Sequence, residues 1–293
     1  MLIQAFLDYL RLERNYSEKT IVAYGADLKE FEEYFKKADT ELDFKKIHSD
    51  NVRNWIVTLM DDGRTETSVN RKLSSLRSFY RFLLRKKEVA VNPMLKVVGP
   101  KKKKPLPSFV REKDMDRLLD ETSFEEGFEG VRDRMILEVF YATGMRLSEL
   151  IGLNDADVDF SAKLIKVTGK RNKQRLIPFG DELAKDLLIY IKVRNETIPQ
   201  GAEAFFVLKD GNRMYPMAVY RIVKRNLSKV VTLKKRSPHV LRQTFATAML
   251  NDRAELRAVK ELLGHESLVT TEVYTHATFE ELKKVYEQAH PRA

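Results

Sequence analysis

Several polar residues in the second half of the chain have the types and spacing needed to hold a phosphate. In residues 237–242, SPHVLR, the serine and the proline predict a helix start, so His239 and Arg242 lie three residues apart near its N-terminus. That end of a helix has free N–H groups and partial positive charge, which suit an anion. A lone His-x-x-Arg is more often an ordinary surface pair, so this motif alone leaves both interpretations open.

A second basic position precedes this helix in the sequence. Arg146 follows Gly144 at the end of an apolar segment, and Glu149 stands one helical turn later. Lys170 lies in residues 168–172, TGKRN, which predict the turn of a small hairpin. The ordinary alternatives are a surface ion pair for Arg146 and Glu149 and a solvated hairpin tip for Lys170.

A histidine and a tyrosine follow further along the chain. Gly264 is expected to end a helix, His265 comes next, and Tyr274 follows nine residues later. Most tyrosines are half-buried aromatic residues, so Tyr274 also has a purely structural interpretation. The order and spacing of the whole set therefore carry more information than any one member.

Positive charge is concentrated in three segments of the chain. The 293 residues include 53 Lys and Arg against 43 Asp and Glu, a net charge of +10. Segments 70–104, 163–175 and 221–242 carry +11, +6 and +8, which leaves −15 on the remainder. One such run is usually a solvated surface, but three together favour a polyanion partner, because Lys and Arg contacts to phosphate supply most non-specific affinity for nucleic acid.

The composition excludes several classes of protein. A hydrophobic share of 43% is enough to form a core, and the absence of cysteine excludes disulfides, iron–sulfur clusters and a thiol nucleophile. The five histidines lack carboxylate partners at ligand spacing, so neither a metal nor another cofactor is expected. No apolar stretch approaches membrane-spanning length and the first residues do not resemble a signal peptide, so a cytoplasmic protein without membrane contact is expected.

Two domains are expected, joined by a basic linker. Residues 1–91 predict four helices, the last starting at Thr67 or Ser68 and combining an apolar stripe with Arg77, Arg81 and Arg85 on another face. Residues 92–107 have the proline and lysine content of an extended linker, and residues 108–293 form the second domain.

The second domain is predicted to be mostly helical around a small antiparallel hairpin. Helices are expected at about 131–141, 181–194, 217–229, 239–250 and 254–263, with a short one before Tyr274, a last one from Thr278, and strands at 164–167 and 174–179. The fold class is therefore mainly α, with a four-helix N-terminal domain and an α-rich second domain that contains little β structure.

In order and spacing, these residues resemble the catalytic set of the tyrosine recombinases, the phage integrase family. Residues 142–150, ATGMRLSEL, resemble its first arginine box, and residues 169–173 with Arg175 and Pro178 resemble its lysine hairpin. Residues 263–276 resemble its nucleophile box, and residues 68–80, SVNRKLSSLRSFY, resemble the last helix of the SAM-like core-binding domain in Xer-type members. Gln243 and Val269 depart from the usual pattern at positions that are not expected to be catalytic.

The resemblance implies a site-specific recombinase that cuts and rejoins DNA through a 3′-phosphotyrosyl intermediate, without metal or ATP. Tyr274 would attack the phosphodiester, Arg146 and Arg242 would stabilise the developing charge, and Lys170 would protonate the leaving 5′ oxygen. His239 would act as a base or a donor, His265 would donate to the phosphate, and Glu149 would orient an arginine or His239. The expected DNA contacts are Arg71, Lys72, Arg77, Arg81, Arg85, Lys101, Lys102, Lys103, Lys104, Arg171 and Lys173.

The same resemblance implies the partners and the biological role. The substrate would be double-stranded DNA with a roughly palindromic site, bound by a homo- or hetero-tetramer on two such sites, and a DNA translocase could activate it. The tail 279–293 would dock into a neighbouring protomer, although its apolar spacing equally fits a helix packed on its own domain. Xer-like resolution of chromosome or plasmid dimers is the first interpretation. A mobile-element integrase or invertase, a type IB topoisomerase-like enzyme and a non-catalytic DNA-binding protein are the alternatives.

Overall fold

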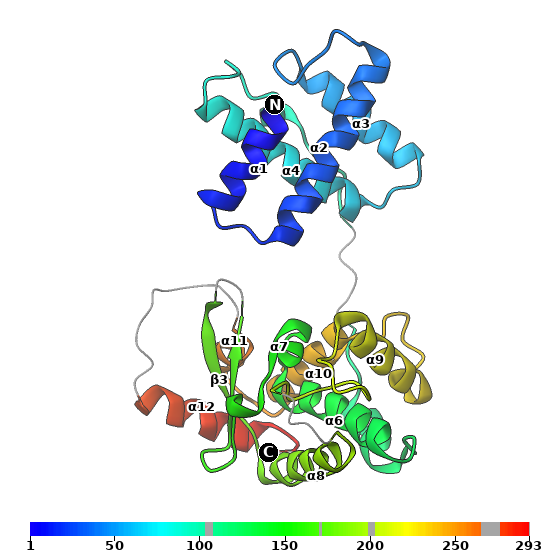
Figure 1. Ribbon diagram of the computed structural model, residues 1–293, viewed down its shortest axis with the longest axis vertical. Helices are drawn as coiled ribbons and strands as arrows, with labels where there is room; N and C mark the ends of the chain where they lie inside the picture. The colour runs from blue at the N-terminus through cyan, green and yellow to red at the C-terminus, as the bar shows by residue number, and fades with distance from the viewer. Residues whose placement is uncertain (103–107, 170–171, 199–202, 265–275, 293) are drawn as a thin grey trace. The chain divides into compact units, whose positions relative to one another are not determined.

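The computed structural model divides the chain into two compact units, Met1–Pro105 and Leu106–Ala293 (Figure 1). It describes residues 1–102, 108–169, 172–198, 203–264 and 276–292. Within these ranges the protein is mainly helical with one small antiparallel sheet, which confirms the predicted fold class. None of the helices in the described part of the chain is long and apolar enough to cross a bilayer.

The N-terminal unit is a bundle of four helices around an aromatic core. Phe6, Phe31, Trp55 and Phe79 are all at most 1% exposed and lie on different helices, so each helix contributes a large side chain to one shared interior. The elements are α1 (Leu2–Leu12), α2 (Glu18–Ala38), α3 (Ser49–Asp61), α4 (Glu66–Arg85) and the short 3-10 helix η1 (Pro93–Lys96).

The ends of the N-terminal unit differ in detail from the sequence prediction. α4 begins at Glu66, slightly before the expected start, because the side chain of Thr65 caps the helix by accepting a hydrogen bond from the Ser68 amide at 3.3 Å. Residues 93–97 lie in the segment expected to be linker, yet Met94 and Val97 are buried in the N-terminal core. Composition alone favoured a linker because prolines and lysines surround these two apolar side chains.

The C-terminal unit is built around α6 (Phe128–Thr143), which is buried along almost its whole length. It contacts α8, α9 and α10, and its buried residues occur at almost every position, so an apolar or paired side chain is needed on every face. The unit comprises α5 (Glu112–Asp116), the π-type turn η2 (Arg117–Glu121), α6, α7 (Leu147–Gly152), η3 (Asp155–Asp157), β1 (Val158–Asp159), β2 (Leu164–Thr168), β3 (Gln174–Pro178), α8 (Asp181–Thr197), α9 (Pro216–Val230), α10 (Pro238–Asn251), α11 (Leu256–Leu263) and α12 (His276–Ala289).

The sheet of this unit has three antiparallel strands in the order β1-β2-β3. In the predicted hairpin, β2 pairs with β3 so that Ile165 lies opposite Ile177 and Val167 opposite Arg175. Ile165, Val167 and Ile177 point into the core, which fixes the register of the hairpin. The sequence did not predict β1, because a strand of two residues shows no alternation.

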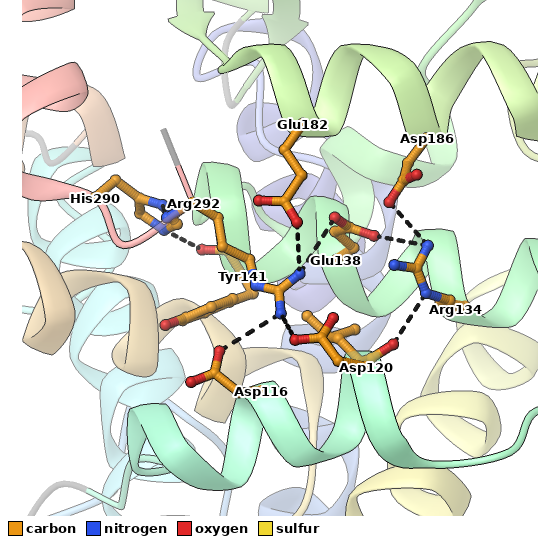
Figure 2. A network of polar contacts seen from close by, with 10 residues as sticks. Asp116, Asp120, Arg134, Glu138, Tyr141, Glu182, Asp186, His290 and Arg292 are labelled. Carbon is orange, nitrogen blue, oxygen red and sulfur yellow. Dashed lines mark hydrogen bonds and ion pairs between the residues drawn. The ribbon is translucent and has the colours of Figure 1, made fainter.

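The last described helix packs on its own unit. α12 begins at His276, before the predicted start, and it places Leu282, Tyr286 and Ala289 against buried side chains of α10 and α11. Beyond it, Arg292 is only 6% exposed, and its guanidinium lies among carboxylates from four other elements, α5, η2, α6 and α8 (Figure 2). We call these four residues the acidic cluster: Asp116, Asp120, Glu138 and Glu182.

A buried histidine completes this attachment (Figure 2). The Nε2 atom of His290 lies 3.1 Å from the carbonyl oxygen of Tyr141, and its Nδ1 accepts a hydrogen bond from the amide of Arg292 at 3.1 Å. Burial lowers the pKa of His290 to about 4, so the ring is neutral at physiological pH. The tail is therefore held by apolar contacts along α12 and by polar contacts just after it.

Candidate active site

Arg146 is held at the start of α7 by Glu149. Its main-chain amide donates to Glu149 Oε2 at 2.7 Å and its Nη1 donates to Oε1 at 2.8 Å. Its other terminal nitrogen, Nη2, donates to the carbonyl oxygen of Gly264 at 2.7 Å. Gly144 makes the preceding turn possible: its φ is +58°, and a Cβ there would lie 2.5 Å from the ring of Phe245.

Arg242 is held by carbonyl groups from two distant segments. It lies at the start of the second turn of α10 and is 8% exposed. Its Nη1 donates to the carbonyl oxygen of Gly144 at 2.6 Å, and its Nη2 donates to that of Leu263 at 2.5 Å. Arg146 and Arg242 are thus brought together by consecutive carbonyl groups at the end of α11, although they are far apart in the sequence.

The hairpin approaches the same place through Gly169 and Arg175. A Cβ built on Gly169 would lie 3.4 Å from Glu149 Oε1 and 3.8 Å from Arg146 Nη1, so the main chain just before Lys170 borders these two side chains. Arg175 donates to both carboxylate oxygens of Glu149, at 2.6 and 2.9 Å. Three cationic side chains and one carboxylate therefore meet here, and we call these four residues the arginine site: Arg146, Arg175, Arg242 and Glu149.

The electrostatics of the site follow from this arrangement. Burial opposes ionisation of Glu149, but hydrogen bonds and charge from Arg175 and Arg146 outweigh it and hold the pKa of Glu149 below its usual value. Burial, together with the charges of Arg146 and Arg175, lowers the pKa of Arg242 to about 10. Arg242 stays protonated at neutral pH, and the site has an excess of positive charge suited to an anion.

The remaining catalytic candidates divide into one that is described and three that are not. His239 lies in the first turn of α10 and is exposed, available to an external ligand. Lys170, His265 and Tyr274 lie outside the described residues, as do Arg171, Lys103 and Lys104 among the expected DNA contacts. Within the part of the chain that is described, no group of three His, Asp or Glu side chains is arranged to hold a metal ion.

The expected DNA-binding side chains of α4 differ in how free they are. Lys72 is 6% exposed, and its ammonium contacts the buried carboxylate of Asp27 and that of Glu30. Arg71 makes a bidentate pair with Asp27, at 2.6 Å to each oxygen. These contacts give Lys72 a structural role inside the bundle, so its part in DNA binding stays a prediction that the burial disfavours.

The other expected contacts are more accessible. Arg77 donates to the carbonyl oxygen of Val97 at 3.1 Å, and Arg81 is exposed on the same helix. Arg85 lies over the ring of Tyr9, 5.4 Å from its centroid. Three further expected DNA contacts are exposed: Lys101, Lys102 and, in the hairpin, Lys173.

The sequence analysis quoted Arg175 as part of a motif but gave it no role. A signal was present in the strand pattern, because Arg175 stands two residues before the buried Ile177 and therefore lies on the same, inward face of β3. A charged residue at an inward position of a strand needs a buried partner, and Glu149 is that partner.

Comparison with known proteins agrees with this geometry. Residues 108–281 match the Phage integrase family, and residues 3–87 match the N-terminal SAM-like domain of phage integrases. The chain belongs to the phage integrase family, the tyrosine recombinases. The predicted family is thus confirmed across both units.

Curated tyrosine recombinases are similar over nearly the full length. The tyrosine recombinase XerC of Chlorobaculum tepidum is 40% identical, covering 98% of this chain and 94% of the relative. That of Staphylococcus saprophyticus is 38% identical, covering 99% and 97%.

Solved structures share the fold. XerH site-specific recombinase bound to difH substrate, in a pre-cleavage complex, has a TM-score of 0.70 at 22% identity and covers 95% of this chain and 83% of that chain. The Tn1549 transposon integrase in complex with circular intermediate DNA has a TM-score of 0.73 at 19% identity, covering 96% and 98%.

Proposed function

We propose that this chain is a site-specific recombinase that cuts and rejoins duplex DNA through a covalent link between Tyr274 and a 3′ phosphate. The observation that carries the proposal is the placement of Arg146 and Arg242. Both are fixed by the carbonyl groups of Leu263 and Gly264, which lead directly into the segment that contains His265 and Tyr274. The relatives named tyrosine recombinase XerC support the same activity.

The chemistry is a pair of transesterifications. The phenolic oxygen of Tyr274 forms a bond to phosphorus while the bond from phosphorus to the 5′ oxygen breaks. His239 takes up the phenol proton and Lys170 supplies a proton to the departing 5′ oxygen, while His265 donates a hydrogen bond to the phosphate. A 5′ hydroxyl of a second strand then reverses the step, so the phosphodiester energy is conserved and no ATP is required.

The arginine pair supplies electrostatic stabilisation of the transition state. Negative charge grows on the non-bridging oxygens during attack, and guanidinium groups bind such oxygens with two parallel hydrogen bonds. Arg146 and Arg242 are already held by carbonyl groups and by Glu149, so little reorganisation is needed when the phosphate arrives. This arrangement places the cost of ordering them in folding rather than in the reaction.

The biological role that fits best is Xer-like resolution of chromosome or plasmid dimers by a cytoplasmic, nucleoid-associated enzyme. The DNA partner is a duplex with a roughly palindromic site, bound by a homo- or hetero-tetramer on two such sites, with a DNA translocase as an activator. In the assembled state the tail that includes α12 would leave its own unit and dock on a neighbour. Arg292 in that tail could pair with the acidic cluster of its own copy or with that of a neighbouring copy, because the charges are complementary in both cases.

Replacing Tyr274 by phenylalanine tests the proposal directly. The variant lacks the nucleophilic oxygen but keeps the shape of the side chain, so it should bind DNA as the wild type does and form no covalent adduct. The wild-type protein is first used to capture, as covalent adducts, the genomic fragments that it cleaves. Nicked duplexes with the captured sequence then trap the adduct, which is measured on a denaturing gel. Adducts that persist in the variant would exclude Tyr274 as the nucleophile, and supercoil relaxation without site preference would favour a topoisomerase.

A further inference from the structure

Arg175 makes more contacts at the arginine site than any role in the hairpin alone requires. Its side chain is 9% exposed, and two of its nitrogens donate to Glu149 Oε1 and Oε2 at 2.6 and 2.9 Å. The third, Nε, donates to the carbonyl oxygen of Leu262 at 2.9 Å. A single guanidinium therefore joins β3, the first turn of α7 and the last turn of α11.

These contacts reach the residues immediately before two of the undescribed catalytic candidates. A Cβ built on Gly264, which precedes His265, would lie 3.1 Å from Arg175 Cδ and 3.3 Å from its Nε. Glu149, the partner of Arg175, borders Gly169, which precedes Lys170. The main chain leading to His265 and the main chain leading to Lys170 are thus both packed around one ion pair.

The same ion pair also determines the position of Arg146. Glu149 is 2% exposed and accepts hydrogen bonds from Arg146 and from Arg175, so its carboxylate is fixed from two sides. If Arg175 were neutral, the buried carboxylate would keep a single charged partner and could rotate with it. A buried ion that loses one partner is costly, and the surrounding groups rearrange to satisfy it.

We propose that Arg175 is a positioning residue for strand cleavage: through Glu149 it fixes Arg146, and through the end of α11 it fixes the main chain that leads to His265. The proposal rests on the recombinase function proposed above. It does not require Arg175 to touch DNA, so its loss should slow the chemical step and leave binding nearly unchanged. Displacements of about 1 Å at a reacting group are sufficient for rate losses of about 100-fold.

The test is the single-turnover rate of covalent adduct formation on the nicked duplex captured by the wild-type protein, with binding to the same duplex measured separately. We expect Arg175→Gln to lower the rate about 10- to 100-fold, with the dissociation constant changed by less than about 3-fold. Arg175→Lys keeps the charge but cannot satisfy Glu149 and Leu262 together, so it should recover only part of the rate. If binding weakens as much as cleavage slows, the proposal is wrong.

A double-mutant cycle shows whether Arg175 acts through its partner. If it does, the loss in Arg175→Gln combined with Glu149→Gln should be clearly smaller than the product of the two single losses, because both substitutions remove the same ion pair. Losses that multiply would mean that the two residues act independently, and would overturn the proposal.

Arg194 provides a matched control for folding effects. It is 3% exposed, makes a bidentate pair with Asp155 at 2.7 Å to each oxygen, and donates to the carbonyl oxygen of Phe205 at 3.0 Å. Arg194→Gln should lower the melting temperature to a similar extent without slowing cleavage by the folded fraction. Equal slowing in both variants would reduce Arg175 to a general structural role. Wild-type protein that forms no adduct on any fragment would instead contradict the recombinase function itself.

Discussion

A guanidinium can serve a phosphate only if other groups fix its orientation, and main-chain carbonyl groups do this for both arginines. The motif predicted that Arg146 and Arg242 belong together, because their residue types and order resemble a known set. It could not predict how they are held, since Arg242 bonds to carbonyls 98 and 21 residues away. For the same reason Arg175 received no role, because its acceptors lie 26 and 87 residues away in the sequence.

The sequence pattern also did not indicate which charged side chains are buried. Lys72 in α4 was among the expected DNA contacts. The structure places the ammonium of Lys72 beside Asp27 and Glu30, which disfavours a contact with DNA. A lysine on a helix with an apolar stripe reveals its direction only when its neighbours from other helices are known.

Replacing His290 by glutamine should flatten the dependence of stability on pH. Burial lowers the pKa of His290 in the folded protein to about 4, against 6.5 for an unperturbed histidine. The unfolded state therefore takes up the proton first as the pH falls. Stability of the wild type should therefore decrease from about pH 6.5 towards pH 4, by up to about 3 kcal/mol in total. Denaturant unfolding of both proteins at about pH 7.5 and about pH 5 measures the difference.

The comparison between the two proteins isolates the histidine. Burial raises the pKa of Glu138 to about 7, and its contribution has the opposite sign, because the folded state binds that proton more tightly. Glu138, the rest of the acidic cluster and Arg292 are present in both proteins, so their contributions largely cancel. Parallel pH profiles would show that His290 is not buried in neutral form.

At the scale of elements, the sequence predicted most helices because their apolar faces repeat with the helical period. α9, for example, has one buried face that contains Val219, Ile222 and Val223. Termini were less certain, since caps such as Thr65 act through local hydrogen bonds that several neighbouring residues could make equally well. The short strand β1 and the packing of residues 93–97 depend on tertiary contacts and had no periodic signal.

Replacing Gly264 by alanine should disturb the C-terminal end of α11 in two ways. Its φ of +62° disfavours any side chain by about 1 kcal/mol, and the new Cβ would press on Arg175 at 3.1 Å. We expect a lower melting temperature and slower adduct formation. Gly63→Ala is the control, because its φ is +75° but nothing lies within 4 Å of the added Cβ, so only stability should fall. Equal cleavage rates in the two variants would contradict the importance of this contact.

At the scale of the whole molecule, the net charge of +10 conceals an uneven distribution. The segment 163–175 contains β2 and the start of β3 with Arg175, and the segment 221–242 contains Arg242, so part of the positive charge belongs to the arginine site. The third segment, 70–104, includes most of α4 and four consecutive lysines. In the proposed function, one part of this positive charge would attract DNA at long range and another part would bind one phosphate.

Changing Lys101, Lys102, Lys103 and Lys104 together to glutamine should reduce the salt dependence of DNA binding. If each lysine neutralises one phosphate, the slope of log K against log salt should fall by about 3 to 4. Fluorescence anisotropy with a random duplex measures the slope. Lys72→Gln serves as the comparison: its ammonium is paired inside the bundle, so the variant should lose stability and keep the wild-type slope. An unchanged slope in the quadruple variant would show that these lysines do not contact phosphates.

The position of Arg292 has a consequence for the order in which the protein can be completed during synthesis. The acidic cluster brings Asp116, Asp120, Glu138 and Glu182 to one place, and Arg292 contacts all four. A ribosome makes these carboxylates long before it makes the arginine, so the emerging unit holds a group of like charges without this counter-ion. We expect the nascent domain to remain loosely packed there, and open to chaperones, until α12 and Arg292 have left the exit tunnel.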